Sequence, residues 1–117
     1  EPPASVYRYY DNNYSANYLL GTSYYQIEDF VNAEKYLLKA LLIFPGSRIS
    51  KHTLAMIYDQ NGSWVKSDSL YLELISTDST DAQAYNNFAY SLLERHDNLE
   101  LALERSIIAY KIRRKPN

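Results

Sequence analysis

The segment LGTSY at residues 20–24 decides the fold, because the chain repeats its pattern twice. It returns as LAMIY at 54–58 and as FAYSL at 88–92, each time 34 residues later. Every copy has a large apolar residue, then a small one, then another large one three positions on. A fixed period of this length indicates a helical unit that buries its apolar side only by packing on copies of itself. We therefore expect a stacked array of helices.

Each repeat divides into two predicted helices joined by a short turn. In chain order the predicted helices cover 17–26, about 30 to the turn at 45–47, 47 or 48 to 60, 64 to about 76, 82–95, and 99 to about 114. Pro45 and Gly46 end the second helix, and Ser47 can cap the third. The last turn is one residue longer than the others, since Ala102 lies 69 residues after Ala33, which is two periods plus one.

This pattern resembles the tetratricopeptide repeat (TPR) family over essentially the whole chain. The residues that carry the resemblance are Leu20-Gly21, Tyr24, Ala33, Leu37, Ala40 and Pro45, then Leu54-Ala55, Tyr58, Gly62 and Tyr71, then Tyr85, Phe88-Ala89, Leu92, Ala102 and Ala109. The resemblance implies an all-α fold, a right-handed superhelix of three helix-turn-helix repeats in one array. The repeats are predicted at about 14–47, 48–81 and 82–117. Residues 1–13 are predicted to be the tail of a preceding repeat, and we expect the array to continue in a longer protein.

The composition excludes several classes of function. The chain has 117 residues, a formal net charge of −2 and no cysteine. A net negative charge argues against sequence-independent nucleic-acid binding, which needs a basic face. Without cysteine there are no disulfides and no zinc-thiolate sites. The longest apolar run, 40–44, is too short to cross a membrane. Cytoplasm and periplasm both stay open as locations, because tyrosine-rich TPR sequences of bacterial style occur in both.

No set of residues in the sequence predicts catalysis. The two histidines, His52 and His96, lie in different repeats, one on a helix and one in a turn. No His-Glu-x-x-His motif, glycine-rich phosphate loop or cluster of metal ligands occurs in the sequence. We therefore expect no enzymatic activity, no cofactor and no metal site.

The first helix of each repeat carries a second set of residues, which faces away from the apolar stripe at 100° per residue. These candidate binding residues are Tyr18, Thr22, Tyr25, Gln26, His52, Met56, Asp59, Gln60, Asn86, Tyr90, Leu93 and Glu94. In TPR proteins this face lines a concave groove that holds peptides, so the resemblance implies a groove of aromatic, amide and mildly acidic character. We expect Tyr18, Tyr25, His52, Met56, Asn86 and Tyr90 to be exposed together. Partial packing of single residues against their neighbours is the alternative interpretation.

The resulting hypothesis is a non-catalytic interaction module that binds a protein or peptide, either an extended segment or a partner helix. Two rivals remain: a spacer or self-assembly segment of a longer array, and a regulatory domain of a larger enzyme. Apolar residues on the last helix, Ile107, Ile108 and Ile112, are expected to promote self-association at the end of the array. The same helix ends in a basic cluster, which suits either an acidic partner or the dipole of the helix itself. That cluster comprises Arg105, Lys111, Arg113, Arg114 and Lys115.

Overall fold

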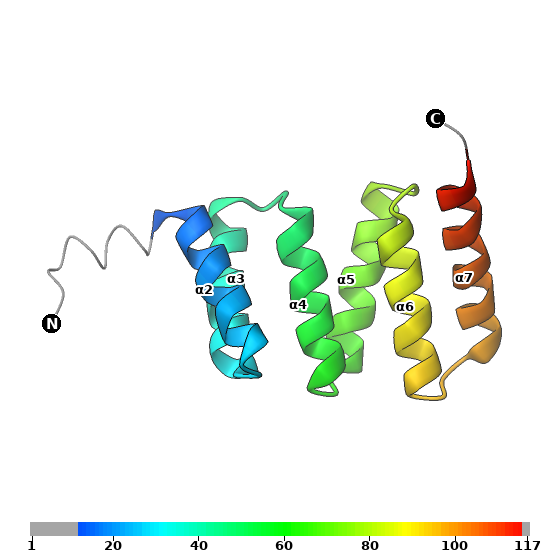
Figure 1. Cartoon of the computed structure of the whole chain (residues 1–117), viewed down its shortest axis with the longest axis horizontal. Coiled ribbons are helices and arrows are strands. Elements are labelled where there is room, and N and C mark those ends of the chain that lie inside the picture. Colours follow the sequence, from blue (N-terminus) through cyan, green and yellow to red (C-terminus); the bar gives the residue numbers. More distant parts are fainter. Residues whose placement is uncertain (1–11, 116–117) are drawn as a thin grey trace, which may run out of the picture. The chain divides into compact units, whose positions relative to one another are not determined.

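The computed structural model describes residues 12–115, and these form six α-helices (Figure 1). In chain order they are α2 (Tyr14–Gln26), α3 (Phe30–Ile43), α4 (Arg48–Gln60), α5 (Trp64–Thr77), α6 (Ala82–Glu94) and α7 (Leu99–Arg114). The predicted all-α class is confirmed, since residues 12–115 contain no strand. Residues 1–11, which belong to the predicted tail of a preceding repeat, lie outside the described residues. The helices belong to two compact units, α2 to α4 in the first and α5 to α7 in the second.

Polar residues spaced 34 apart start the first helix of each repeat. Asn13, Ser47 and Asp81 each accept a hydrogen bond from the backbone N–H three residues ahead, at 2.8, 3.2 and 3.0 Å. A side-chain oxygen at this position satisfies one of the backbone donors that a helix start leaves without a partner. The predicted cap at Ser47 is therefore confirmed, and Asp81 caps α6 in the same way. Because Asn13 caps α2, that helix begins at Tyr14, three residues before the predicted start at residue 17.

The turn inside each repeat has one residue in the left-handed region, again at 34-residue spacing. Glu28, Gly62 and His96 have φ angles of 63°, 79° and 52°. In each turn the next backbone N–H donates to a carbonyl five residues earlier, at 2.9, 2.8 and 2.9 Å, which is the usual way to close a helix C-terminus. Asn98 adds a second left-handed residue, with φ of 37°, in the last turn only. The extra residue predicted for that turn is thereby confirmed.

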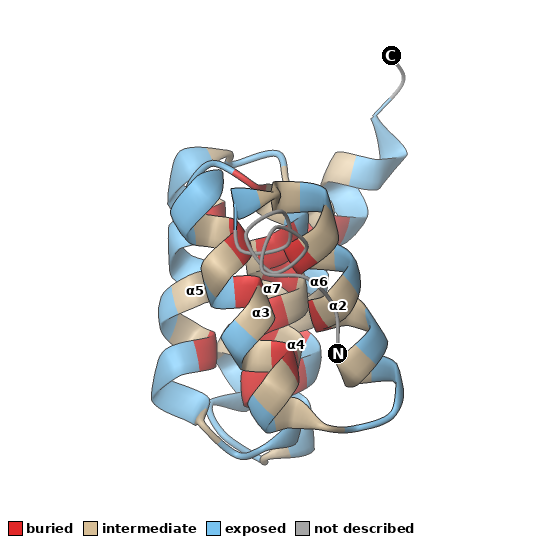
Figure 2. Cartoon of the chain, turned by 90° about the vertical axis from the view of Figure 1, so that its left-hand side faces the viewer, coloured by how far each residue is buried: buried red, intermediate tan, exposed pale blue. Residues whose placement is uncertain are grey.

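In the first unit, α2 and α3 approach so closely that their contact excludes a side chain on α2. A Cβ built on Gly21 would lie 2.6 Å from Leu37 Cγ and 3.2 Å from the Leu37 backbone nitrogen. Leu37 is fully buried, as are Ala33 and Ala40 on the same side of α3. Each helix nevertheless carries exposed residues as well (Figure 2). The small residue of the repeat pattern thus serves close helix packing, as the resemblance implies.

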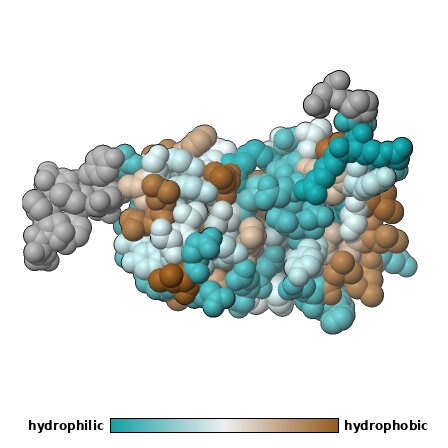
Figure 3. All heavy atoms as spheres, in the orientation of Figure 1, coloured by the Kyte–Doolittle hydropathy of each residue, from teal (hydrophilic) through white to brown (hydrophobic). Residues whose placement is uncertain are grey.

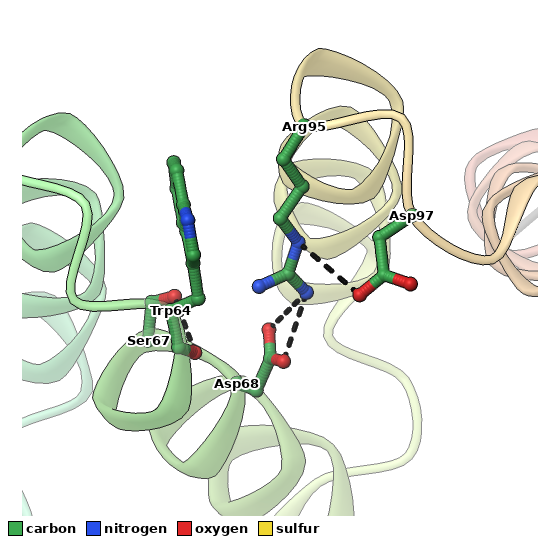
Figure 4. Close-up of polar contacts among 5 residues, drawn as sticks. All are labelled: Trp64, Ser67, Asp68, Arg95 and Asp97. Carbon is green, nitrogen blue, oxygen red and sulfur yellow. Dashed lines mark hydrogen bonds and ion pairs between the residues drawn. The ribbon is translucent and has the colours of Figure 1, made fainter.

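In the second unit, aromatic rings and one arginine join α5 to α6. The Tyr71 ring stacks on Phe88 with centroids 5.6 Å apart. Arg95, which follows the last residue of α6, places its Nη2 2.7 and 2.8 Å from the two carboxylate oxygens of Asp68 on α5 (Figure 4). Its guanidinium also lies 5.3 Å from the Trp64 ring centroid. Because the Arg95 side chain is almost fully buried, this ion pair fixes α6 on α5 more firmly than a surface pair would.

Candidate functional site

Two first helices, α2 and α4, lie in contact within the first unit and are joined near both ends. At their N-terminal ends the Tyr14 hydroxyl lies 2.6 Å from Ser47 Oγ and 3.3 Å from Ser50 Oγ. At their C-terminal ends Gln60 Nε2 donates to the Tyr25 hydroxyl at 2.7 Å. Tyr14, Tyr18 and Tyr25 follow one another at intervals of one or two helical turns, so they share one side of α2. The two bonds therefore align this side of α2 with the matching side of α4.

Tyr25 is half-buried at this junction. Its ring lies 6.2 Å from Phe30, and its hydroxyl accepts the Gln60 bond. Burial raises the pKa of Tyr25 above its ordinary value, the Gln60 hydrogen bond lowers it, and the negative charge of Asp59 raises it. The phenol therefore stays neutral, and the half-buried side chain brings one apolar ring and one polar hydroxyl to this junction.

The rest of the α2 side is also partly open. Tyr18 is half-buried and stacks on Tyr14 with centroids 6.1 Å apart, and Tyr14 in turn meets Phe44 edge to face at 5.4 Å. Thr22 is half-buried, and its hydroxyl donates to the Leu19 carbonyl. On α4 the structure leaves Met56 and Asp59 half-buried and Gln60 exposed, and Gln26 at the end of α2 is exposed as well. These side chains give the first unit an aromatic and amide surface across α2 and α4.

The expectation that His52 is exposed is wrong, because only 7% of its surface is accessible. The buried residues of α4 are Ser50, His52, Leu54, Ala55, Ile57 and Tyr58. At 100° per residue they cover roughly 220° of the helix surface, with His52 at one edge. The prediction assumed a single narrow apolar stripe, as on a helix covered from one side. Since α4 packs against both α2 and α3, its buried side is wider.

In the second unit the candidate residues of α6 are all exposed. They are Asn86, Tyr90, Leu93 and Glu94. The Tyr90 side chain is 62% accessible, and a hydrogen bond to Glu94 together with the charge of that carboxylate raises its pKa. Tyr90 and Glu94 are four residues apart and therefore share a side of the helix. An exposed tyrosine beside a carboxylate and a leucine offers a partner both apolar area and hydrogen bonds.

Sequence reasoning missed Tyr14 and the two serines that contact it. Tyr14 lay outside the predicted first helix, so it was not assigned to any helical face. The signal that could have found it is the 34-residue spacing of Asn13, Ser47 and Asp81, which marks the start of every first helix. The 34-residue period alone does not indicate the Tyr25–Gln60 bond, because Gln60 corresponds to Gln26 rather than to Tyr25.

Two kinds of feature are absent from residues 12–115, a cluster of metal ligands and a membrane-spanning helix. No group of three or more His, Asp or Glu side chains is arranged there to hold a metal ion. None of the helices within this range combines the length and the apolar character needed to cross a membrane. The candidate residues other than His52 are tyrosine, amide, carboxylate, hydroxyl and apolar side chains.

The six helices of residues 12–115, with turns that recur every 34 residues, define a TPR-like helical-repeat fold. Two crystal structures of MamA match the chain with TM-scores of 0.79 and 0.78, at 19% and 20% identity over 88% and 87% of its length. PilF of Pseudomonas aeruginosa matches with a TM-score of 0.74, at 28% identity over 84%. No protein-family model and no curated protein matches the sequence. The chain spans 60% and 55% of the two MamA chains and 44% of the PilF chain, so this likeness establishes the fold.

Proposed function

We propose that this chain is a non-catalytic protein-interaction module, and that the first helices of its repeats carry the binding surface. The binding residues we assign are Tyr18, Thr22, Tyr25, Gln26, Met56, Asp59 and Gln60 in the first unit, with Asn86, Tyr90, Leu93 and Glu94 in the second. The observation that carries the proposal is the 2.7 Å bond between Gln60 and Tyr25. It links two successive first helices through side chains that are not fully buried, so α2 and α4 offer a partner one shared surface.

The chemistry of this surface suits an extended peptide or an amphipathic helix. Partly exposed tyrosines provide large, rigid contact area with a hydrogen-bonding tip, and such residues often dominate binding energy. Gln26, Gln60 and Asn86 offer amide donors and acceptors for the backbone of an extended segment. Because lysine and arginine are absent from the assigned set, we do not expect it to hold a terminal carboxylate through charge.

A photo-reactive amino acid placed at Met56 or at Tyr90 tests the proposal in the full-length protein inside its own cells. We expect each position to form a covalent adduct with the same protein partner. The matched control is Val65, an exposed apolar residue on a second helix, where we expect no such adduct. Adducts that are absent, or equally abundant at Val65, would contradict the proposal and favour a spacer. An adduct with a catalytic domain of the same polypeptide would indicate a regulatory domain instead.

Substitutions then separate binding from folding. Tyr90→Ala should weaken capture of that partner while leaving the free energy of unfolding nearly unchanged, because Tyr90 is exposed. Tyr25→Ala separates binding from folding less well, because it also removes the hydrogen bond to Gln60 and the contact with Phe30. Tyr25→Phe keeps the ring and removes only the hydroxyl, and is therefore the better variant in the first unit. Capture that survives both Tyr90→Ala and Tyr25→Phe would exclude these tyrosines from the binding surface.

A further inference from the structure

The outer side of α7 is an apolar strip that the rest of the described chain leaves open. Leu103 is 62% and Ile107 44% accessible, and Ile108 beside them is half-buried. With Glu100, Glu104 and Lys111 these three residues line one shallow hollow on the surface. In Figure 3, which has the orientation of Figure 1, apolar atoms gather where Figure 1 draws α7. Leu103 and Ile107 lie four residues apart, about one helical turn, and an exposed apolar strip of this kind is typical of a surface that packs against another helix.

The charges along this strip are separated by sign. Glu100 and Glu104 lie in the N-terminal half of α7, and Lys111 lies near its C-terminal end. Arg105 does not interrupt the pattern, because its guanidinium lies 5.8 and 5.9 Å from the ring centroids of Tyr85 and Phe88 on α6. One half of the exposed strip is thus acidic and the other basic, with the apolar residues between them.

We propose that this strip binds the same strip of a second copy of the chain, with the two α7 helices antiparallel. The twofold axis would pass between Ile107 and Ile108. Glu104 lies three residues before Ile107, and Lys111 lies three residues after Ile108. An antiparallel pair centred there places Glu104 of each copy opposite Lys111 of the other, and isoleucine opposite isoleucine at the centre. The proposal is independent of the binding function assigned above to the first helices.

A second copy is the occupant that the charges favour. A twofold interface must be complementary to itself, and a strip that is acidic at one end and basic at the other meets this condition only when the helices are antiparallel. A parallel pair would place glutamate opposite glutamate and lysine opposite lysine. The strip belongs to a single helix, so the interface is smaller than that of a permanent dimer and the dimer should dissociate on dilution.

Charge reversal tests the arrangement directly. We expect sedimentation equilibrium of the chain, over a series of concentrations, to show reversible dimers. Glu104→Lys and Lys111→Glu should each weaken the dimer about tenfold, since each places like charges opposite one another twice. The double variant, E104K/K111E, should recover the wild-type dissociation constant. An equimolar mixture of the two single variants should form a heterodimer, because every opposed pair then has opposite charges.

An apolar variant and a matched control complete the experiment. Ile107→Glu should abolish dimers, whereas Leu42→Glu, which changes an exposed apolar residue on α3, should leave them unchanged. Circular dichroism verifies that each variant is folded, and if Ile107→Glu does not fold, the mixture of charge variants decides alone. A wild-type chain that stays monomeric at every concentration overturns the proposal. So do single reversals without effect, which a parallel pair predicts, and a double variant that stays as weak as the single ones.

Discussion

In the helix pair α2–α3 a glycine faces a leucine, whereas in the pair α6–α7 the equivalent positions hold alanine and serine. Gly21 and Ala89 both occupy the small position of the first helix. Leu37 lies four residues after Ala33, and Ser106 lies four residues after Ala102, so these two are equivalent on the second helix. A Cβ on Gly21 would meet Leu37 Cγ at 2.6 Å. In the last repeat the first helix carries an additional Cβ, that of Ala89, and the side chain of Ser106 on α7 is smaller than that of Leu37 on α3.

In these two pairs the residues compensate in size: glycine on one helix accompanies leucine on the other, and alanine accompanies serine. Protein interiors are close-packed, so a methyl group added on one helix leaves less room for the side chain that faces it on the other. This compensation predicts that changes in the α2–α3 pair depend on both members at once.

The largest effect is expected at Leu37, which is fully buried. Leu37→Ala should lower the free energy of unfolding by about 2–5 kcal/mol, because it leaves a cavity beside Gly21 that helix packing closes only in part. The matched control is Leu38→Ala on the next residue, which is 43% accessible and should cost much less. Urea denaturation of both variants measures the difference. Equal losses would mean that α3 is packed through another face.

In the other pair, Ala89→Leu should lower the free energy of unfolding by about 1–3 kcal/mol, through overpacking between helices. Ala89 is buried, whereas its neighbour Tyr90 is exposed, so Tyr90→Leu serves as the control for the added leucine. Urea unfolding again gives the values. A neutral Ala89→Leu would show that α6 does not pack through the small residue, and the repeat register would be wrong.

A smaller net effect is expected for Gly21→Ala. Overpacking against Leu37 costs about 1–3 kcal/mol, but alanine also gains about 1 kcal/mol over glycine in a helix. The net loss in the wild-type background should therefore be about 1 kcal/mol. In the Leu37→Ala background the clash with the leucine side chain is absent and only the 3.2 Å approach to the backbone nitrogen of residue 37 remains, so Gly21→Ala should become stabilising. A double-mutant cycle by urea denaturation measures this change of sign, and additive effects would disprove the volume compensation.

The sequence predicted the helices and their order because apolar spacing, proline and glycine mark them directly. It also predicted the longer last turn, from the offset between Ala33 and Ala102. It did not predict the left-handed residues at Glu28 and His96, because glycine is the residue type that indicates this conformation directly and of the three positions only Gly62 is a glycine. At the candidate site, position on a helical face predicted the exposed residues of α6. The same reasoning failed for His52. Its burial depends on how many helices pack against α4, and the sequence of α4 alone does not show this.

The smallest change in stability is expected at Tyr58, whose counterpart in the second unit is a residue that cannot ionise. Tyr58 of α4 is buried, and the position one period later holds Leu92 on α6. Burial, a hydrogen bond to Glu34 and the negative charge of that carboxylate together raise the pKa of Tyr58 well above its ordinary value. The folded state therefore keeps the phenol protonated at a pH where the unfolded chain ionises it. The stability linked to this difference is complete below the unfolded pKa of about 10 and is lost as the pH rises above it.

Tyr58→Phe tests this linkage, because phenylalanine keeps the ring and cannot ionise. At neutral pH the variant should be less stable by about 1 kcal/mol, since it loses the hydrogen bond to Glu34. Between about pH 9 and about pH 11 the wild type should lose more stability than the variant, so the gap between them should narrow. Urea denaturation at the two pH values measures it, with Tyr110→Phe, an exposed tyrosine on α7, as the control for general alkaline effects. A gap that stays constant or widens would mean that Tyr58 ionises as readily in the folded chain as in the unfolded one. Tyr58 and Leu92 would then differ in the shape of their side chains but not in the pH dependence of the stability that they contribute.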